Sequence, residues 1–314
     1  MLKKIFIIPY FGQLPNYFYV WLSTAEKNNT FDFLIVTDQN VKSNSENVKV
    51  IKSSFKSLQE KFSEILGDEI VLDSPYKLND YRPAFGFVFS DIVKNYDYWG
   101  FTDVDTILGK LDDFYTDEYI MQFERIGIRG HLQLFRNEKN VNMKFLTRTT
   151  PGFNFSTVQK YKFPMHFDEE WGINHVFNNT DILSSNLNLS VADVSPKHYN
   201  FIDLNRPLEV VIYEYSHGKL IEISKSGKKT LVPYAHFQKR KLNIECGIDY
   251  NNFLVVPNKI VNINSSVNWF EMSQKSKEIK VFIRYYQHMI RNGELFMHII
   301  YKMRLAVLKK KWSK

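Results

Sequence analysis

Strand-like and helix-like patterns alternate along the first 110 residues of the sequence. Short apolar runs at 4–9, 31–37 and 48–51 have the length and composition of strands, and apolar residues between them recur at helical spacing. The helical stretches are expected at 16–27, 55–66 and 84–94. A β-α-β order implies a parallel sheet joined by right-handed crossovers. The sequence therefore predicts an α/β fold that begins with a Rossmann-type half at residues 1–110.

Two aspartates, Asp103 and Asp105, follow an apolar, aromatic run at 98–102. They are expected at the carboxyl end of a strand, where open α/β sheets bind their ligands. Carboxylates beside a core strand are costly unless they are neutralised, and a hard divalent cation that carries a diphosphate is a suitable partner. The pair predicts a site for a metal ion and a sugar nucleotide. The alternative is chance, because Asp-x-Asp arises in most chains of this length.

The sequence becomes β-rich after the first 110 residues. Runs at 131–135, 208–215, 220–223 and 230–235 are strand-like and are separated by turn sequences. The chain has 314 residues and is 44% hydrophobic, which allows a sizeable core. We expect one domain at 1–265, with a nucleotide-sugar half at 1–110 and a mixed acceptor half at 111–265, followed by a helical tail at 266–314.

Positive charge is concentrated at the C-terminal end. Residues 275–314 carry a net charge of +9, which leaves −2 for residues 1–274 of the total of +7. A nearly neutral body argues against a nucleic-acid partner. In the tail, apolar residues recur at helical spacing next to Lys and Arg: Phe296, Ile299, Ile300, Met303 and Val307. This pattern predicts a basic amphipathic helix on an anionic membrane surface, too interrupted by charge to span it. A helix docked on the body is the alternative.

Cysteine usage and the N-terminal sequence indicate a cytoplasmic protein. The single cysteine, Cys246, cannot form a disulfide within the chain. The apolar run at 5–8 is cut short by Pro9 and Gly12, so no secretory signal is expected. Together with the basic tail, these features predict a peripheral protein on the inner face of the plasma membrane.

Residues after the first two strands are candidates for nucleotide binding. Pro9, Tyr10, Phe11 and Gly12 follow the first strand, and Asp38 follows the second. These residues are expected at the same sheet edge as Asp103, where an aromatic ring could stack on a base and a carboxylate could bind a ribose. An ordinary loop is the alternative.

A charged turn precedes the helix expected at 84–94. Lys77, Asp80 and Arg82 lie within residues 76–83, an arrangement suited to binding a diphosphate at a helix start. A plain capped helix start is the alternative, although it would need fewer charges.

Three consecutive acids, Asp168, Glu169 and Glu170, are candidates for a general base. Consecutive side chains point in different directions, so one or two of them can face a cleft, where a carboxylate with a raised pKa could deprotonate a sugar hydroxyl. An acidic helix N-terminus is the alternative reading.

The segment His236–Arg240 follows an apolar strand directly. An imidazole can complete an oxygen-rich metal shell, so His236 is a candidate ligand. Lys239 and Arg240 could neutralise a departing diphosphate. A lone histidine is more often structural, but two cations beside it favour a site.

Six ordered motifs in residues 3–242 resemble one family of bacterial glycosyltransferases. The motifs are IIPYFG at 7–12, YKLNDYRPAFG at 76–86, WGFTDVD at 99–105, GHLQLFRN at 130–137, EEWG at 169–172 and HFQKR at 236–240. The family is of the GT-A type, acts in capsule and O-antigen pathways, and includes galactofuranosyltransferases. The resemblance implies a GT-A fold, a nucleotide-sugar donor, and Mn²⁺ or Mg²⁺ held by the Asp-x-Asp pair.

The resemblance also implies roles for individual residues. Asp103 and Asp105 would contact the metal and the ribose-diphosphate, and His236 would be a further metal or phosphate contact. Glu169 or Glu170 would be the base, while the neighbouring Asp168 leaves the register of the acidic cluster open.

The expected reaction is transfer of a sugar from a UDP-sugar to a hydroxyl of a lipid-linked oligosaccharide. Kinship suggests UDP-galactofuranose as the donor, and a base on the far face of the sugar would give inversion. A metal-dependent phosphodiesterase or nucleotidyltransferase is an alternative, although the histidines are scattered for a two-metal site. A nucleic-acid-binding protein that uses the basic tail is a further alternative.

Overall fold

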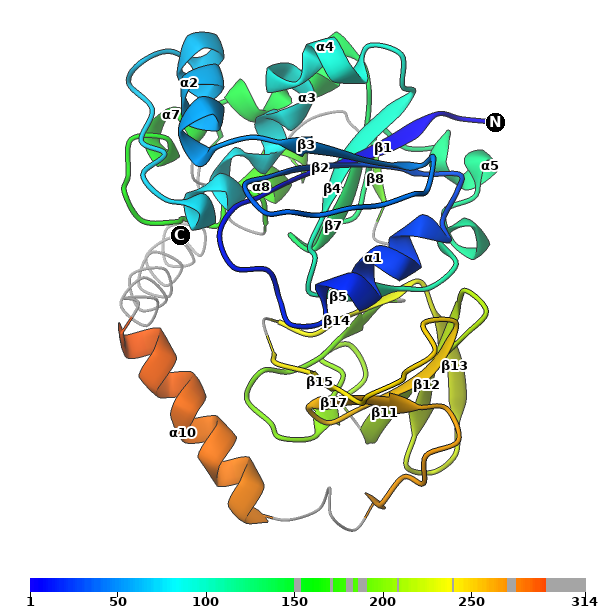
Figure 1. Cartoon of the computed structure of the whole chain (residues 1–314). Helices are drawn as coiled ribbons and strands as arrows, with labels where there is room; N and C mark the ends of the chain where they lie inside the picture. The colour runs from blue at the N-terminus through cyan, green and yellow to red at the C-terminus, as the bar shows by residue number, and fades with distance from the viewer. Residues whose placement is uncertain are drawn as a thin grey trace, which may run out of the picture.

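Two bodies lie one above the other in the computed structural model of the chain (Figure 1). The upper body is an α/β layer structure, and the lower body is built mainly of antiparallel strands. The described residues are 1–149, 154–169, 172–178, 183–185, 191–207, 209–238, 240–269 and 275–291.

The upper body is built on a mixed seven-stranded sheet in the order β3-β2-β1-β4-β7-β6-β8. Its four parallel strands are β1 (Lys4–Tyr10), β2 (Asp32–Thr37), β3 (Val48–Lys52) and β4 (Tyr98–Thr102). Strand β7 (Leu132–Arg136) runs antiparallel to β4 and continues the sheet into β6 (Arg125–Ile126) and β8 (Ser184–Ser185). The chain is thus mixed α/β with a sheet rich in parallel pairs.

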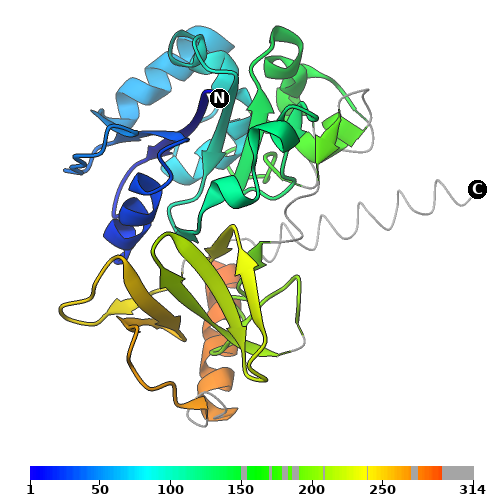
Figure 2. The ribbon, with the colours of Figure 1, turned by 90° about the vertical axis from the view of Figure 1, so that its right-hand side faces the viewer.

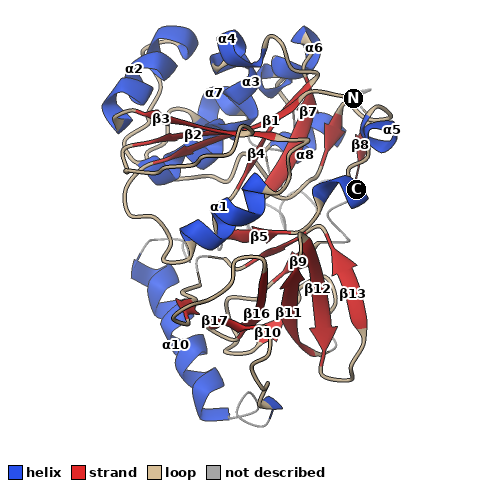
Figure 3. Cartoon of the chain, turned by 45° about the vertical axis from the view of Figure 1, so that its right-hand side comes forward, coloured by secondary structure: helices blue, strands red, loops and turns tan. Residues whose placement is uncertain are grey.

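Alternation along β1 places a core on each face of this sheet. Ile5 and Ile7 pack in one buried cluster, whereas Phe6 and Ile8 pack in the other. Helices α2 (Phe55–Leu66), α3 (Phe85–Val88) and α4 (Ser90–Val93) cover the first face, and α1 (Phe18–Glu26) covers the second (Figure 3). This is the layering expected of strands that alternate with helices.

Short helices complete the upper body. They are η1 (Pro75–Ala84), η2 (Leu111–Asp113), α5 (Asp117–Ile120), α6 (Lys139–Asn142), η3 (Lys144–Leu146), α7 (Phe155–Val158) and α8 (Ile173–Asn178). The helix expected at 84–94 is two short helices instead, because Phe89 leaves the helical region at φ −104° and ψ 29°.

The lower body contains a second seven-stranded sheet, in the order β13-β12-β11-β16-β17-β15 with β10 also paired to β11. Its strands are β10 (Phe201–Ile202), β11 (Val210–Ser216), β12 (Lys219–Ser224), β13 (Lys229–Val232), β15 (Asn243–Ile244), β16 (Asn252–Val256) and β17 (Lys259–Asn262). All pairs are antiparallel except that of β15 with β17. Figure 2 shows this sheet below the upper body.

The first sheet does not end where the sequence analysis divides the two halves. Strands β6, β7 and β8 all lie beyond residue 110, yet they extend the sheet that β1 begins. In particular, the run expected at 131–135 pairs with β4 over its whole length rather than with the later β-rich segments. The physical reason is that β4 would otherwise be an edge strand with unpaired backbone groups.

A small three-stranded sheet lies between the two bodies. It consists of β5 (Thr106–Leu108), β14 (Tyr234–His236) and β9 (Ala192–Asp193), with β14 in the middle. Leu108 packs in a core of the upper body, whereas its neighbour Ile107 packs in the core of the lower one. This sheet therefore joins the two hydrophobic cores.

Pro233 divides the strand that the sequence analysis expects at 230–235. Residues before it form β13 of the second sheet, and residues after it form β14 of the small sheet. Proline has no backbone N–H to continue a ladder, and here its carbonyl accepts a hydrogen bond from the Gly109 N–H at 2.8 Å. The break turns the chain so that it reaches β5.

Helix α10 (Lys275–Arg291) runs along the lower body (Figures 1 and 2). Its Glu278 accepts backbone hydrogen bonds from Tyr199 at 2.9 Å and Asn200 at 3.0 Å. The amphipathic segment expected at 296–307 lies outside the described residues. No helix within the described part of the chain is both long enough and apolar enough to cross a bilayer.

Candidate functional site

The acids Asp103 and Asp105 occupy the link between β4 and β5. Strand β4 is buried at all five positions, but the side chains that follow it keep partial exposure, 23% for Asp103 and 12% for Asp105. The link is held by two hydrogen bonds: the Asp103 N–H donates to the His131 carbonyl at 2.9 Å, and the Thr106 hydroxyl donates to the Asp103 carbonyl at 2.8 Å. Two carboxylates are thereby presented from a fixed backbone.

Strand pairing brings His236 to these acids. In the small sheet His236 lies opposite Thr106, and the Phe237 N–H donates to the Asp105 carbonyl at 2.9 Å. As a result, His236 Nε2 lies 3.5 Å from Asp105 Oδ1 and 3.8 Å from Asp103 Oδ2. His236 lies 133 residues after Asp103 and 131 after Asp105 in the sequence, yet the three side chains converge.

Asp103, Asp105 and His236 could hold a divalent metal ion. One ligand atom from each lies within 4.8 Å of the others, and two carboxylate oxygens with one imidazole nitrogen suit Mn²⁺ or Mg²⁺. Burial alone would lower the pKa of His236, but the Asp105 and Asp193 carboxylates raise it well above its usual value. A metal ion would therefore displace a proton from Nε2, since only the neutral ring is a ligand.

Arg82 links Asp103 to the acidic cluster. Its guanidinium contacts the carboxylates of Asp103 and Asp168, and also donates to the Gly130 carbonyl at 2.7 Å. Burial opposes the charge on Arg82, but Asp103 and Asp168 together keep its pKa above the usual value. Arg82 is thus a fixed cation between Asp103 and Asp168, and its expected contact with a diphosphate stays a prediction.

Asp168 is a buried carboxylate whose pKa is raised. One oxygen accepts from Arg82 Nη1 at 3.0 Å, and the other has no hydrogen-bond partner within the described residues. Burial raises the pKa of Asp168 to about 7 against the opposing effect of Arg82, and Glu169 contributes to the rise. Glu169 lies against Gly130, because a Cβ added there would be 2.4 Å from Glu169 Oε1. Glu170 lies outside the described residues.

The loop after β1 lies near the same acids. Burial raises the pKa of Tyr10, and the charges of Asp105 and Asp103 raise it further. Gly12, with φ 87°, donates its N–H to Asp38 Oδ1 at 3.0 Å. Pro9 is the penultimate residue of β1, and Phe11 is buried against Phe55. The Tyr10 hydroxyl donates to the Gln13 carbonyl at 3.1 Å, within the same loop.

The side chains of Lys77 and Asp80 are buried and do not face solvent. Both side chains are fully buried and pair with each other at 2.6 Å. Lys77 Nζ also donates to the carbonyls of Val158 and Phe163 at 3.0 Å, which uses all three of its hydrogens. Asp80 accepts from the backbone at Met165 and Phe167. The expected diphosphate contact is replaced by an ion pair that holds the segment leading to Asp168.

Arg240 likewise forms its hydrogen bonds within the protein. Its guanidinium donates to the carbonyls of Ser195, His198 and Tyr199 and lies over the Phe201 ring. These contacts fix the segment after β9, so the expected role in neutralising a diphosphate is not available in this arrangement. Lys239 lies outside the described residues.

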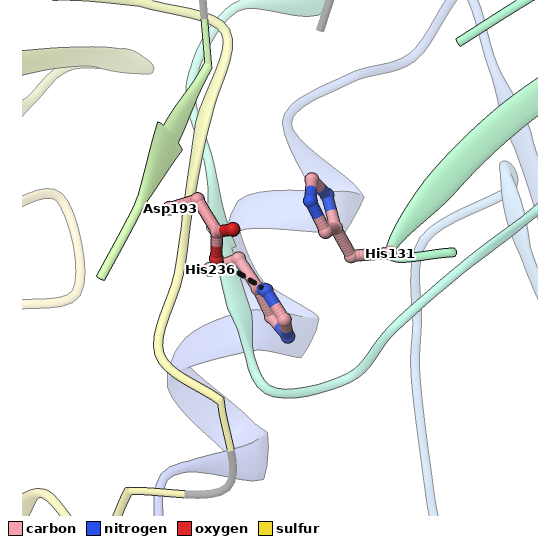
Figure 4. Close-up of side chains that lie close together, drawn as sticks. All are labelled: His131, Asp193 and His236. Carbon is pink, nitrogen blue, oxygen red and sulfur yellow. Dashed lines mark hydrogen bonds and ion pairs between the residues drawn. The ribbon is translucent and has the colours of Figure 1, made fainter. Parts of the chain in front are cut away.

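Two residues beside His236 were not among the sequence candidates. Asp193 ends β9 and lies next to His236 in the parallel pair, with its Oδ1 3.0 Å from His236 Nδ1 (Figure 4). His131 stacks on His236 at 4.5 Å between ring centroids. His131 belongs to a motif of the resemblance, which could have flagged it, whereas Asp193 stands in a short apolar run that carries no such signal.

Fold and site together define a mixed α/β protein with an acid and histidine cluster beside the carboxyl end of its fourth parallel strand. The chain belongs to DUF6625, a family of unknown function, whose model matches residues 6–264. No curated protein matches the sequence. Among solved structures, it has a likeness to the galactosyltransferase LgtC, whose structure contains donor and acceptor sugar analogs. The identity is 12%, the match covers 44% of this chain and 59% of that chain, and the TM-score is 0.27.

Proposed function

We propose that this chain is a metal-dependent glycosyltransferase of the GT-A type. The donor is a UDP-sugar, with UDP-galactofuranose as the first to test, and the acceptor is a hydroxyl of a lipid-linked oligosaccharide made for a capsule or O-antigen. The observation that carries the proposal is the convergence of Asp103, Asp105 and His236 at the carboxyl end of β4. Open α/β sheets bind their ligands at this edge.

The cluster supports metal-assisted departure of a nucleoside diphosphate. A bound divalent ion would act as a Lewis acid on the diphosphate oxygens, where negative charge grows as the bond to the sugar breaks. Asp103, Asp105 and His236 would hold that ion from a rigid backbone. Arg82 keeps the Asp103 carboxylate oriented through its own contact.

The acidic cluster provides the base in this proposal. The acceptor hydroxyl loses its proton to a carboxylate of residues 168–170 as its oxygen bonds to the anomeric carbon, and the electron pair of the broken bond leaves with UDP. Attack from the face opposite the diphosphate inverts the anomeric centre. A carboxylate whose pKa is near neutrality is well matched to this task, and Asp168 has that property.

Product analysis tests the reaction class. Protein with Mn²⁺ is incubated with a panel of UDP-sugars, alone and with lipid-linked acceptors, and the nucleotide product is identified. Release of UDP together with a glycosylated acceptor supports the proposal. Formation of UMP or free sugar phosphate would show a phosphodiesterase or nucleotidyltransferase instead. Before turnover is measured, metal-dependent thermal stabilisation by one UDP-sugar would identify the donor, because a ligand of the native state raises stability.

Transfer at saturating Mn²⁺ should become faster as pH rises through about 7. Asp168 can accept a proton only when it is ionised, and burial raises its pKa to about 7. The check is kcat/KM in buffers on both sides of neutrality. Asp168→Asn should be slow at every pH, with the rising limb removed. A limb that survives in this variant would come from another group, such as His236, and Glu169→Gln and Glu170→Gln would then be compared as base variants.

A membrane-surface setting for this enzyme is supported by α10. Ile279, Phe282, Ile283 and Ile290 recur at helical spacing and are between 49% and 62% exposed, which leaves an apolar stripe on the helix. Lys280, Arg284 and Arg291 are exposed on the same helix. An amphipathic helix of this kind binds anionic lipid through apolar burial and charge together. The proposal thus includes a peripheral position at the inner face of the plasma membrane, which the exposed stripe of α10 supports.

Phe282→Asp with Ile283→Asp should reduce sedimentation with vesicles that contain anionic lipid. The substitutions replace two stripe residues with acids, which removes apolar burial and adds repulsion from the lipid charge. Co-sedimentation with anionic and neutral vesicles measures the effect. Leu231→Asp, an exposed apolar residue of β13, is the matched control and should bind like the unmodified protein. Equal binding of all three proteins would remove the membrane role of α10.

A further inference from the structure

Asp193 contacts His236 from the side of the ring opposite the candidate metal ligands. It is 3% exposed, and its Oδ1 is bonded at 3.0 Å to Nδ1 of His236, the nitrogen that faces away from Asp103 and Asp105. The sheet register sets this contact, because β9 and β14 pair in parallel with Asp193 beside His236. Figure 4 shows the Asp193 carboxylate bonded to the His236 ring; the bond is to Nδ1, whereas Nε2 lies near Asp103 and Asp105.

The Asp193 carboxylate is itself fixed and charged. Gln238 Nε2 donates to the same Oδ1 at 2.8 Å, and Arg129 Nη1 lies 3.9 Å from Oδ2. The Asp193 N–H donates to Asp203 at 3.1 Å, which anchors the backbone. With Gln238 bonded to it and Arg129 beside it, the Asp193 carboxylate is placed to accept a hydrogen from Nδ1 of His236.

His131 packs against the ring face of His236. Its Nδ1 is 2.7 Å from the Tyr234 hydroxyl, and its ring is inclined by 30° to that of His236. The nitrogen lone pairs lie in the ring planes, and two nearly parallel stacked rings do not aim them at one point. His131, Asp193 and His236 are therefore better explained as a support than as a separate metal site.

We infer that Asp193 is a positioning residue that keeps hydrogen on His236 Nδ1, leaving Nε2 as the metal-binding nitrogen, while His131 restricts rotation of the ring. A histidine ligand that donates its second nitrogen to a carboxylate is oriented and made more basic, and loss of such a partner weakens metal binding by about 10- to 100-fold. The inference rests on the proposed metal site and adds the device that tunes it.

The test is Mn²⁺ affinity, measured by electron paramagnetic resonance of free Mn²⁺ in the absence of any substrate. Asp193→Asn keeps an oxygen that can accept from Nδ1 but loses the charge, and should weaken binding by about 10-fold. Asp193→Ala loses both, and should weaken it by about 100-fold. The graded order separates positioning from simple damage, because Asn and Ala differ in whether they retain the hydrogen bond.

Asp203→Asn is the matched control. Asp203 is a buried acid bonded to the Asp193 backbone, it follows β10 directly, and it has no contact with His236 in the described residues. This variant disturbs the same segment and should bind Mn²⁺ like the unmodified protein, with circular dichroism verifying the fold of all variants. A one-dimensional proton spectrum gives a second readout: the hydrogen-bonded Nδ1 proton of His236 should be lost in Asp193→Ala and retained in Asp203→Asn.

Two failures are distinguishable. If the unmodified protein and Asp193→Ala bind Mn²⁺ equally well, or if the Nδ1 resonance persists in Asp193→Ala, the role of Asp193 is overturned while the proposed function stands. If the unmodified protein binds no Mn²⁺, the proposed metal site itself is overturned. Weaker binding by Asp203→Asn equal to that of Asp193→Ala would indicate general damage and would also overturn the inference.

Discussion

Replacing Asp103 with asparagine is expected to reduce kcat/KM for glycosyl transfer by about 10³-fold, since a metal ion supplies several kcal/mol of transition-state stabilisation. Asparagine keeps the size of the side chain but removes one of two carboxylates within reach of His236 Nε2. Turnover with a UDP-sugar and the affinity for Mn²⁺ should fall together. Arg82 retains its contacts with Asp168 and Gly130, so the fold should persist.

Asp97→Asn is the control for this prediction. Asp97 is exposed and immediately precedes β4, at the opposite end of that strand from Asp103, and it accepts a hydrogen bond from the Lys3 N–H at 2.8 Å. Its replacement should leave turnover and Mn²⁺ binding unchanged. Full turnover by Asp103→Asn, with Mn²⁺ bound as before, would exclude the metal role of the Asp-x-Asp pair.

Lys77→Ala should lower the free energy of unfolding by about 3–5 kcal/mol, because it leaves a buried carboxylate without its cation. Asp80 is fully buried, and the carbonyls of Val158 and Phe163 would also lose a donor. Urea denaturation followed by circular dichroism measures the loss. If Lys77 instead bound a diphosphate, the variant would be as stable as the unmodified protein and would lose donor affinity.

Two further variants define the cause of that loss. Lys77→Met combined with Asp80→Leu removes both charges and should recover part of the stability, since an apolar pair can replace a buried ion pair. Lys56→Ala breaks an exposed pair with Glu60 on α2, where both side chains are more than half exposed. Pairs of that kind contribute little, so this variant should unfold like the unmodified protein.

Local sequence patterns were sufficient for the parallel strands and for the acids that follow them. Apolar runs and helical spacing predict β1 to β3 and α2 within a few residues, because each element buries a face that its own sequence encodes. The position of Asp103 at the carboxyl end of β4 follows from the same reasoning. The placement of β7 beside β4 did not follow, since strand pairing across a sheet is a long-range property.

The remaining parts of the site depend on contacts that no local pattern reveals. Lys77 and Arg82 lie five positions apart in one charged turn. Lys77 is fully buried in an ion pair with Asp80, whereas Arg82 contacts Asp103. A sequence shows charge but not burial. Asp193 reaches His236 only because β9 and β14 pair in register, and Pro233 determines where β14 begins. Both depend on the assembled small sheet.

The small sheet gives the candidate ion a mechanical role. Asp103 and Asp105 follow β4 of the upper body, whereas His236 ends β14, which follows β13 of the lower body. An ion bound by Asp103, Asp105 and His236 would therefore link the two bodies. Binding of the donor nucleotide through this ion would then also make the connection between the two bodies more rigid, because the same three side chains hold the ion and belong to both bodies.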